Sequence, residues 1–162
     1  MEPAPAFDVR TALEELHARA FAWALACCRR DRPRAEDVLH EAYVRVLDGR
    51  ARFDQRSAFK TWLFGVIRVV AREQARRQRA RELLLLTWLA PEPRSPEVVL
   101  RSPLERALDT LPARQREIVQ LVFGHDLTVE EAAQAMGVGL GSARQHYARA
   151  KQRLAELLPR EP

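Results

Sequence analysis

Apolar residues in the first third of the chain recur at helical spacing. Over residues 7–28 they are separated alternately by four and three positions, which predicts one amphipathic helix with a single apolar seam. A polar stretch with a proline, residues 29–33, interrupts the pattern, and a second helix is predicted over residues 34–47. The first seam comprises Val9, Leu13, Leu16, Ala20, Trp23 and Cys27, and the second helix has Leu39, Ala42 and Val46 on its core side.

A third helix is predicted from Ala58 to about Arg81, with Ser57 as its N-cap. Its first half is apolar almost all round, which is typical of the central helix of a bundle. Its second half, residues 72–81, is almost entirely polar and strongly basic. Such a helix end either lies in water or binds an anion. The planar guanidinium of arginine can donate two hydrogen bonds to one phosphate, which makes phosphate a suitable anion.

A proline-rich segment, residues 83–102, follows the third helix and is predicted to be a linker. It also contains an apolar cluster, for which two interpretations stay open. The cluster forms either a short helix packed against a neighbouring domain or a contact strip for a protein partner. The prolines are Pro91, Pro93 and Pro96, and the cluster consists of Leu83–Leu86, Trp88 and Leu89.

The last third of the chain predicts a helix-turn-helix. Thr128 and Glu131 form a capping box, Gly137 stands where a left-handed C-cap is needed, and a second helix follows from about Ser142. The inward stripe of this helix is Ala143, Tyr147, Ala150 and Leu154. Its opposite face is long, flexible and basic, as in helices that enter the major groove of DNA. An ordinary helical hairpin with a solvated basic face is the alternative.

These patterns predict an all-α protein with two small helical domains. The expected organisation is an N-terminal helical bundle over residues 7–82, a flexible linker over 83–102, and a C-terminal helix-turn-helix domain over 103–158. The first helix of the C-terminal domain is predicted to begin after Ser102, which serves as its N-cap. Pro103 then occupies the first helical position, and Glu105 completes a capping box.

Charge and composition favour a nucleic-acid partner. The net charge is +5, and the positive side is almost all arginine, since Lys60 and Lys151 are the only lysines. Arginine suits phosphates and guanine edges better than lysine does. No apolar run is long enough for a membrane span and the N-terminus does not resemble a signal peptide, so we expect a cytoplasmic protein without direct membrane insertion.

The sequence offers no pattern of a catalytic or metal site. It has no Gly-rich phosphate loop, no metalloprotease motif and no paired-carboxylate pocket, so we expect no enzyme activity, no cofactor and no metal. Cys27 and Cys28 are adjacent without partners at ligand spacing, which favours small buried residues over a redox or metal role.

Three segments together resemble one family, the extracytoplasmic-function (ECF) group of bacterial RNA polymerase sigma factors. Residues 35–47, AEDVLHEAYVRVL, are similar to the family's core-binding helix. Residues 53–73, FDQRSAFKTWLFGVIRVVARE, are similar to its promoter-melting segment, and residues 111–154 to its promoter-binding C-terminal domain. His40 replaces the usual glutamine, and Val69 stands where an asparagine is common.

The resemblance implies partners and site residues. The partners are the RNA polymerase core, promoter DNA and an anti-sigma factor. The −35 element is expected to contact Ser142, Arg144, Gln145, Ala148 and Arg149. The −10 element is expected to contact Lys60, Trp62, Arg68, Arg72, Arg76 and Arg77, with Trp62 either a core residue or a direct contact. The polymerase core is expected to contact Asp37, Val38 and Glu41.

Two other functions compete with this one. Residues 111–154 also resemble the output domain of LuxR-type regulators, so a free-standing helix-turn-helix regulator is an alternative. A helical adaptor that binds polymerase or an antagonist without using DNA is another. The basic faces in both halves argue against the adaptor.

Overall fold

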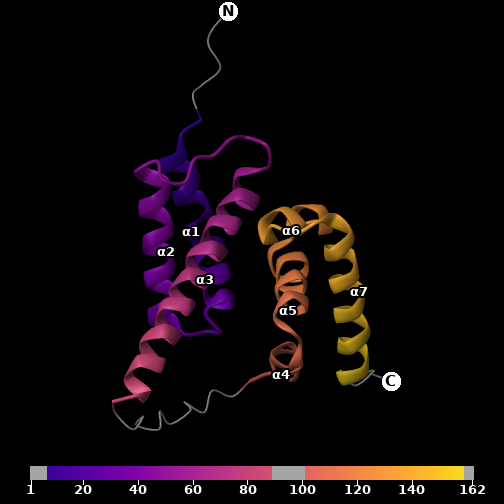
Figure 1. Ribbon diagram of the computed structural model, residues 1–162. Coiled ribbons are helices and arrows are strands. Elements are labelled where there is room, and N and C mark those ends of the chain that lie inside the picture. Colours follow the sequence, from indigo (N-terminus) through magenta and orange to yellow (C-terminus); the bar gives the residue numbers. More distant parts are fainter. Residues whose placement is uncertain (1–6, 89–100, 159–162) are drawn as a thin grey trace, which may run out of the picture. The chain divides into compact units, whose positions relative to one another are not determined.

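The computed structural model describes residues 7–88 and 101–158 of the protein. Within these residues every regular element is a helix, which confirms the predicted all-α class. The N-terminal group consists of α1 (Val9–Cys27), α2 (Arg32–Leu47) and α3 (Phe59–Leu86) (Figure 1). The C-terminal group consists of α4 (Pro103–Thr110), α5 (Ala113–Val119), the π-helix η1 (Gln120–Gly124), α6 (Val129–Met136) and α7 (Leu140–Leu157).

Aspartates begin the first two helices. The Asp8 carboxylate accepts hydrogen bonds from the backbone N–H of Arg10 at 3.0 Å and from the Thr11 hydroxyl at 2.6 Å. Asp31 begins α2 by accepting from the backbone N–H of Arg34 at 3.1 Å. The helix therefore starts two residues earlier than predicted, because Pro33 is tolerated in a first turn that needs no N–H from it.

The core of the N-terminal group forms around Trp23 of α1. Its side chain is fully buried, and its indole N–H donates to the backbone carbonyl of Phe64 at 3.0 Å. The two rings stack with their centroids 5.9 Å apart. Other fully buried side chains of α3 are Leu63, Ile67 and Val70. Burial of so many α3 side chains confirms the first half of this helix as the central element of the group.

The third helix runs further than the sequence predicted. It ends at Leu86 rather than near Arg81, so Leu83–Leu86 continue α3 and do not form a separate short helix. Each of these leucines is more than half exposed, and Trp88 is 85% exposed. Leucine and arginine are good helix formers, which explains the extension. The contact strip therefore remains a hypothesis for this segment, whose last residue, Leu89, lies outside the described residues.

Local capping fixes the C-terminal helices as predicted. The Ser102 hydroxyl accepts from the backbone N–H of Glu105 at 3.2 Å, and the Glu105 carboxylate accepts from the Ser102 N–H at 2.7 Å. Thr128 and Glu131 form the second capping box, with distances of 3.1 and 2.8 Å. Gly137 ends α6 with φ +64°, the left-handed conformation that glycine tolerates best.

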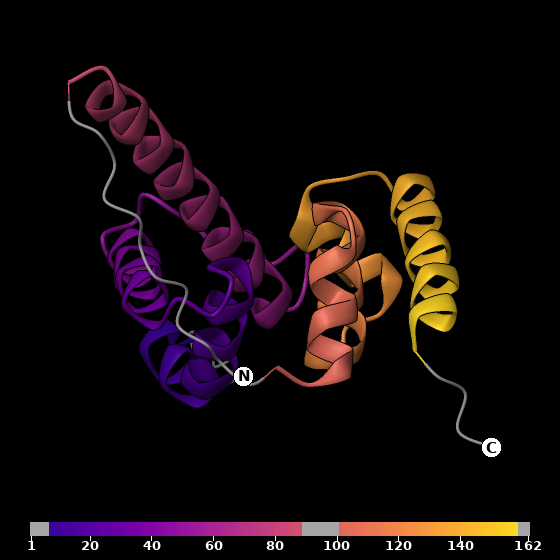
Figure 2. The ribbon, with the colours of Figure 1, turned by 90° about the horizontal axis from the view of Figure 1, so that it is seen from below.

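A small aliphatic core joins α5 and α7. It contains Leu111, Val119 and Ala150, with Leu108 and Leu154 packed against it. Figure 2 shows α7 running beside α5 in this group. The helix that starts after Pro112 was predicted to stay regular up to Gly124, but its last five residues widen into η1. In addition, α7 begins at Leu140, two residues before the predicted Ser142.

Candidate nucleic-acid interface

The first candidate surface is the outer face of α7. Ala143 and Ala150 are fully buried on the inner face and Leu154 is half-buried, as predicted. Tyr147 is also half-buried, and its ring lies 6.0 Å from that of Phe123. The five residues predicted for the −35 element are all exposed: Ser142, Arg144, Gln145, Ala148 and Arg149. The structure thus presents them together on one helix, while their contacts with DNA stay a prediction.

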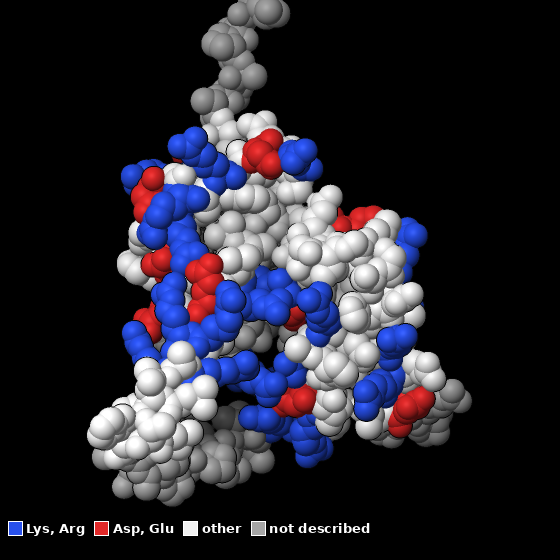
Figure 3. Space-filling model, viewed as in Figure 1, with Lys and Arg blue, Asp and Glu red and all other residues white. Residues whose placement is uncertain are grey.

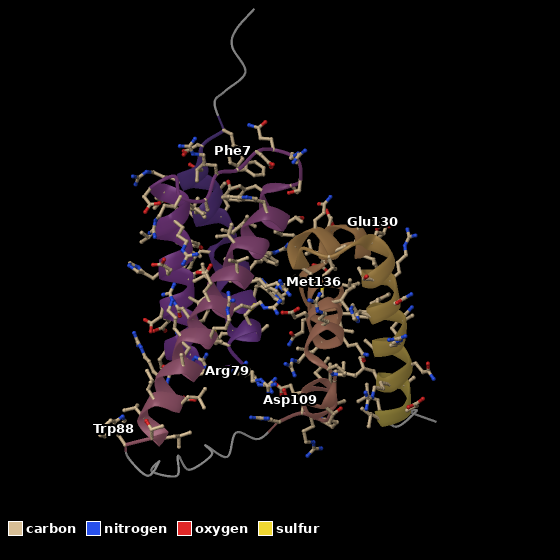
Figure 4. The ribbon with its side chains drawn as sticks, viewed as in Figure 1. Phe7, Arg79, Trp88, Asp109, Glu130 and Met136 are labelled. Atoms are coloured by element: carbon tan, nitrogen blue, oxygen red, sulfur yellow. The ribbon has the colours of Figure 1, made fainter. Side chains whose placement is uncertain are left out.

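One residue of this face is held by a neighbouring helix. A guanidinium nitrogen of Arg144 donates to the carboxylate of Glu130 on α6 at 3.1 Å. Glu130 is labelled in Figure 4. The pKa of Glu130 lies below its usual value, because its own backbone N–H and then Arg144 stabilise the charged form. An exposed ion pair adds little to folding stability. Its main consequence is that Arg144 is oriented before any partner binds.

The second candidate surface is the basic part of α3. Arg72, Arg76 and Arg77 are exposed, as the prediction of a phosphate contact requires. In Figure 3 arginine side chains cover much of this part of the helix, and the last turn, with its leucines, carries no charge. A guanidinium nitrogen of Arg77 lies 3.6 Å from a carboxylate oxygen of Glu73, one turn earlier, and this carboxylate offsets part of the positive charge of Arg77.

Arg68 does not belong to this exposed surface. It is only 6% exposed, and its contact with phosphate stays a prediction. The physical reason for its burial is its position on the helix. Arg68 follows Phe64 by four residues and precedes Ala71 by three, and both of those residues are buried.

An aromatic cluster at the start of α3 was not predicted from the sequence. It consists of Phe7, Phe53, Phe59 and Trp62, and we call it the aromatic cluster. Neighbouring ring centroids in it are 5.1–5.4 Å apart, within the range for favourable tilted and edge-to-face pairs. Trp62 is half-buried, so it is both a packing residue and partly accessible; nearby Lys60 is half-buried too.

The predicted polymerase-binding face of α2 is exposed only in part. Asp37 is exposed, and the Glu41 side chain is 31% exposed and paired with Arg45 at 2.8 Å. Val38, however, is only 1% exposed, which differs from the open surface expected of a docking residue, and its contact with the polymerase stays a prediction. It falls on the buried stripe of α2, four residues before Ala42, and contributes to the core instead.

Other chemistry is scarce in the described residues. Within residues 7–88 and 101–158, no group of three or more His, Cys, Asp and Glu side chains is placed to hold a metal ion. Cys28 is buried, and burial raises the pKa of its thiol, while Cys27 is half-buried. Among the same residues, no helix is long and apolar enough to cross a membrane.

Comparison with known proteins decides the family. Residues 12–81 match the family model of Sigma-70 region 2, and residues 107–156 match that of Sigma-70 region 4. The ECF sigma factor SigF of Caulobacter vibrioides is 33% identical over 129 residues, which cover 77% of this chain and 71% of SigF. The ECF sigma factor EcfG of Rhodopseudomonas palustris is 30% identical over 93% of this chain and 83% of its own length.

The chain belongs to the ECF sigma factors. A solved structure supports the same fold: the sigma factor RpoE of Bartonella quintana, determined in complex with the anti-sigma factor NepR, superposes with a TM-score of 0.72. The two chains are 25% identical, and the match covers 91% of this chain and 94% of RpoE.

Family membership settles the choice between the functions that the sequence left open. This ECF sigma factor acts in promoter-specific initiation of transcription by RNA polymerase. The LuxR-type alternative gains no support, because the N-terminal half also matches a sigma-factor region.

The aromatic cluster is the part of this sigma factor's candidate interface that sequence reasoning missed. Sequence patterns place Phe53 in a loop, and Phe7 only marks the beginning of the first predicted helix. The available signal was the short interval with three aromatic residues, Phe53, Phe59 and Trp62, around the start of α3. Nothing local in the sequence pointed to Phe7.

Proposed function

We propose that this sigma factor contacts its promoter through two separate surfaces. The outer face of α7 binds the −35 element, and the beginning of α3, with the loop before it, opens the −10 element. The observation that carries the proposal is the division of α7. Its five candidate contact residues are exposed on one side, and fully buried Ala143 and Ala150 fix the helix from the other.

At the −35 element the side chains of α7 suit the major groove. Arg144 and Arg149 can each donate two hydrogen bonds to a guanine edge or to a phosphate, and Gln145 can donate one hydrogen bond to an adenine edge and accept another from it. Ser142 and Ala148 are small and let the helix approach closely. One good bidentate contact of this kind contributes about 1–3 kcal/mol to discrimination between bases.

At the −10 element the proposed chemistry is different. Opening requires a base to leave the stack, which costs a few kcal/mol. A partly exposed aromatic ring offsets this cost by about 1–3 kcal/mol for each stacked base, and Trp62 is such a ring. Lys60, Arg72, Arg76 and Arg77 then bind backbone phosphates. Arg68 is buried, and we do not assign it to this surface.

The remaining partner is the polymerase itself. We place the docking surface on α2 at Asp37 and Glu41, whose carboxylates suit a basic surface on the core enzyme. An anti-sigma factor is a further partner, by analogy with RpoE of Bartonella quintana. We assign the −10 and core functions to residues 7–82, the −35 function to 103–158, and the linker to 83–102. The protein itself catalyses no reaction and works in the cytoplasm, where the polymerase is.

Reconstitution with purified bacterial core polymerase tests the proposal. The mixture is used to select promoters from a random DNA pool, and specific initiation is then measured on the selected sequence with and without this protein. We expect initiation only with the protein and only when both elements are intact. Duplex binding without initiation would indicate a regulator, and polymerase binding without a change in DNA choice would indicate an adaptor. Either result would overturn the proposal.

A further inference from the structure

We propose that Phe7, the residue before the N-cap of α1, positions the loop between α2 and α3 for opening of the −10 element. Figure 4 shows Phe7 beside this loop at one end of the N-terminal group. The inference rests on the proposed role of the loop. It adds a positioning residue that lies outside every promoter contact predicted from the sequence and outside the region-2 match, which starts at residue 12.

The polar contacts of the loop, residues 48–58, are mainly local. The Asp48 carboxylate accepts from the backbone N–H of Arg50 at 3.0 Å and from its guanidinium at 2.7 Å. Asp54 accepts from the backbone N–H of Arg56 at 3.2 Å. Contacts between residues two apart fix the shape of a turn. The first part of the loop is also tied to α2, because the Ala51 N–H donates to the Arg45 carbonyl at 2.8 Å and the Arg50 guanidinium lies 3.7 Å from the Glu41 carboxylate. The Asp54–Arg56 contact at the tip is local and does not fix where the tip lies relative to α3.

Phe53 attaches the tip of the loop to α3. Its ring centroid lies 5.2 Å from that of Phe59 and 5.3 Å from that of Trp62, both on α3. The third contact is Phe7, at 5.3 Å from Phe53 and 5.1 Å from Phe59. Phe7 therefore joins the N-terminal segment, the loop and α3 at one point.

Phe7 is placed to hold the loop without being needed for the fold. It is 45% exposed, so little of the core depends on it. The cap of α1 depends on the neighbouring Asp8, whose carboxylate binds Arg10 and Thr11. The central contact of Trp23 with Phe64 uses neither Phe7 nor Phe53. Loss of the Phe7 ring thus leaves a folded protein with a less restrained Phe53.

A less restrained loop affects opening more than any other step. The loop must become ordered before it can hold an unstacked base, and this ordering costs free energy. A looser loop costs more to order, so less of the binding free energy remains to separate the strands. On duplex DNA this energy drives strand separation. On DNA whose −10 strands are already mismatched, separation costs little, so the loop's position matters less.

The experiment compares Phe7→Ala, Phe7→Tyr and the unchanged protein, each assembled with core polymerase. Open-complex formation is measured on the selected promoter as a full duplex and as a template mismatched across the −10 element. We expect Phe7→Ala to lower it roughly tenfold on the duplex, given the loss of two ring contacts, and to leave the mismatched template nearly unaffected. Phe7→Tyr keeps the ring and restores opening.

Phe21→Ala is the matched control. Phe21 is a half-buried phenylalanine further along α1, with the Arg32 guanidinium 5.2 Å from its ring, and it has no place in the aromatic cluster. Any loss it causes should be equal on both templates. Equal losses on both templates for Phe7→Ala, or no loss at all, would overturn the inference while leaving the proposed function standing. Failure of the unchanged protein to open the duplex would instead overturn the proposed function.

Discussion

The two candidate DNA surfaces of this sigma factor are built from different side chains in different ways. The α7 surface is a single helix face of small, amide and arginine side chains. The N-terminal surface joins the aromatic cluster, gathered from three segments, to a row of arginines on α3. Hydrogen-bonding side chains suit the edges of paired bases, and aromatic faces suit bases that have left the stack. This difference supports the proposal that the α7 surface binds duplex DNA and that the aromatic cluster receives bases of opened DNA.

The cores behind these surfaces also differ, and this gives the largest expected effect. Fully buried Trp23 is central to the N-terminal core, whereas the core between α5 and α7 is aliphatic. We expect Trp23→Ala to lower the free energy of unfolding by about 3–5 kcal/mol, because a large cavity replaces the indole. Urea unfolding followed by circular dichroism measures the change.

Trp23→Phe serves as the control for this substitution. It keeps most of the buried ring and removes the 3.0 Å hydrogen bond to the Phe64 carbonyl. Its cost should be clearly smaller than that of Trp23→Ala. Equal costs for the two variants would mean that the hydrogen bond, rather than the packing of the ring, stabilises this core.

The second prediction tests whether the α7 surface distinguishes sequences. Arg149→Ala should weaken binding of the polymerase complex to a matched −35 element by about 1–3 kcal/mol and to a scrambled element by much less. Competition binding with the two DNAs measures the ratio of the two affinities. Equal losses on both would show that Arg149 contacts phosphate, and the contrast between the two surfaces would then be weaker.

The third prediction concerns the arginines of α3, whose contribution to binding should not depend on the DNA sequence. Replacing Arg76 and Arg77 together by alanine should reduce the slope of log affinity against log salt concentration by roughly 1.8 if each binds one duplex phosphate. Matched and scrambled −10 elements should lose affinity alike. The measurement is promoter binding across a salt series. An unchanged slope would show that this part of α3 does not touch DNA.

Sequence reasoning succeeded where structure depends on neighbours in the chain. The capping boxes at Ser102 and Thr128 and the left-handed Gly137 were predicted correctly, since each feature is set within about four residues. The division of α7 into a buried and an exposed face follows from helical periodicity alone. Most of the C-terminal candidate surface was therefore predictable.

The N-terminal surface was less predictable because it depends on contacts between distant residues. Phe7 meets Phe53 only after the chain has folded back through two helices, and periodicity gives no sign of this. Val38 and Arg68 were assigned by similarity to a motif, but the packing of α2 and α3 buries them. Both cases concern side-chain exposure, which a one-dimensional motif does not determine.

The fourth prediction tests the turn before α7. Gly137 has φ +64°, and a Cβ added there would meet no heavy atom within 4 Å, so Gly137→Ala should cost about 1–2 kcal/mol through backbone strain alone. Gly139, also in open space, has φ −67°, and Gly139→Ala should change stability by much less. Thermal unfolding of the two variants compares them. Similar costs would contradict the strain explanation.

The smallest expected effect concerns the ion pair that orients Arg144. Glu130→Gln keeps the shape of the side chain and removes its charge, so Arg144 loses its ionic partner. The affinity for a matched −35 element relative to a scrambled one should therefore fall by about threefold or less. In an Arg144→Ala background the same change should have no effect on the ratio. Because the pKa of Glu130 is lowered, its charge and the pair persist at neutral pH and are lost only as the pH falls through that lowered value. The ratio should therefore be constant between about pH 6 and 8. A Glu130→Gln effect that survives in the Arg144→Ala background would show that Glu130 acts on DNA through its own charge, not through the arginine.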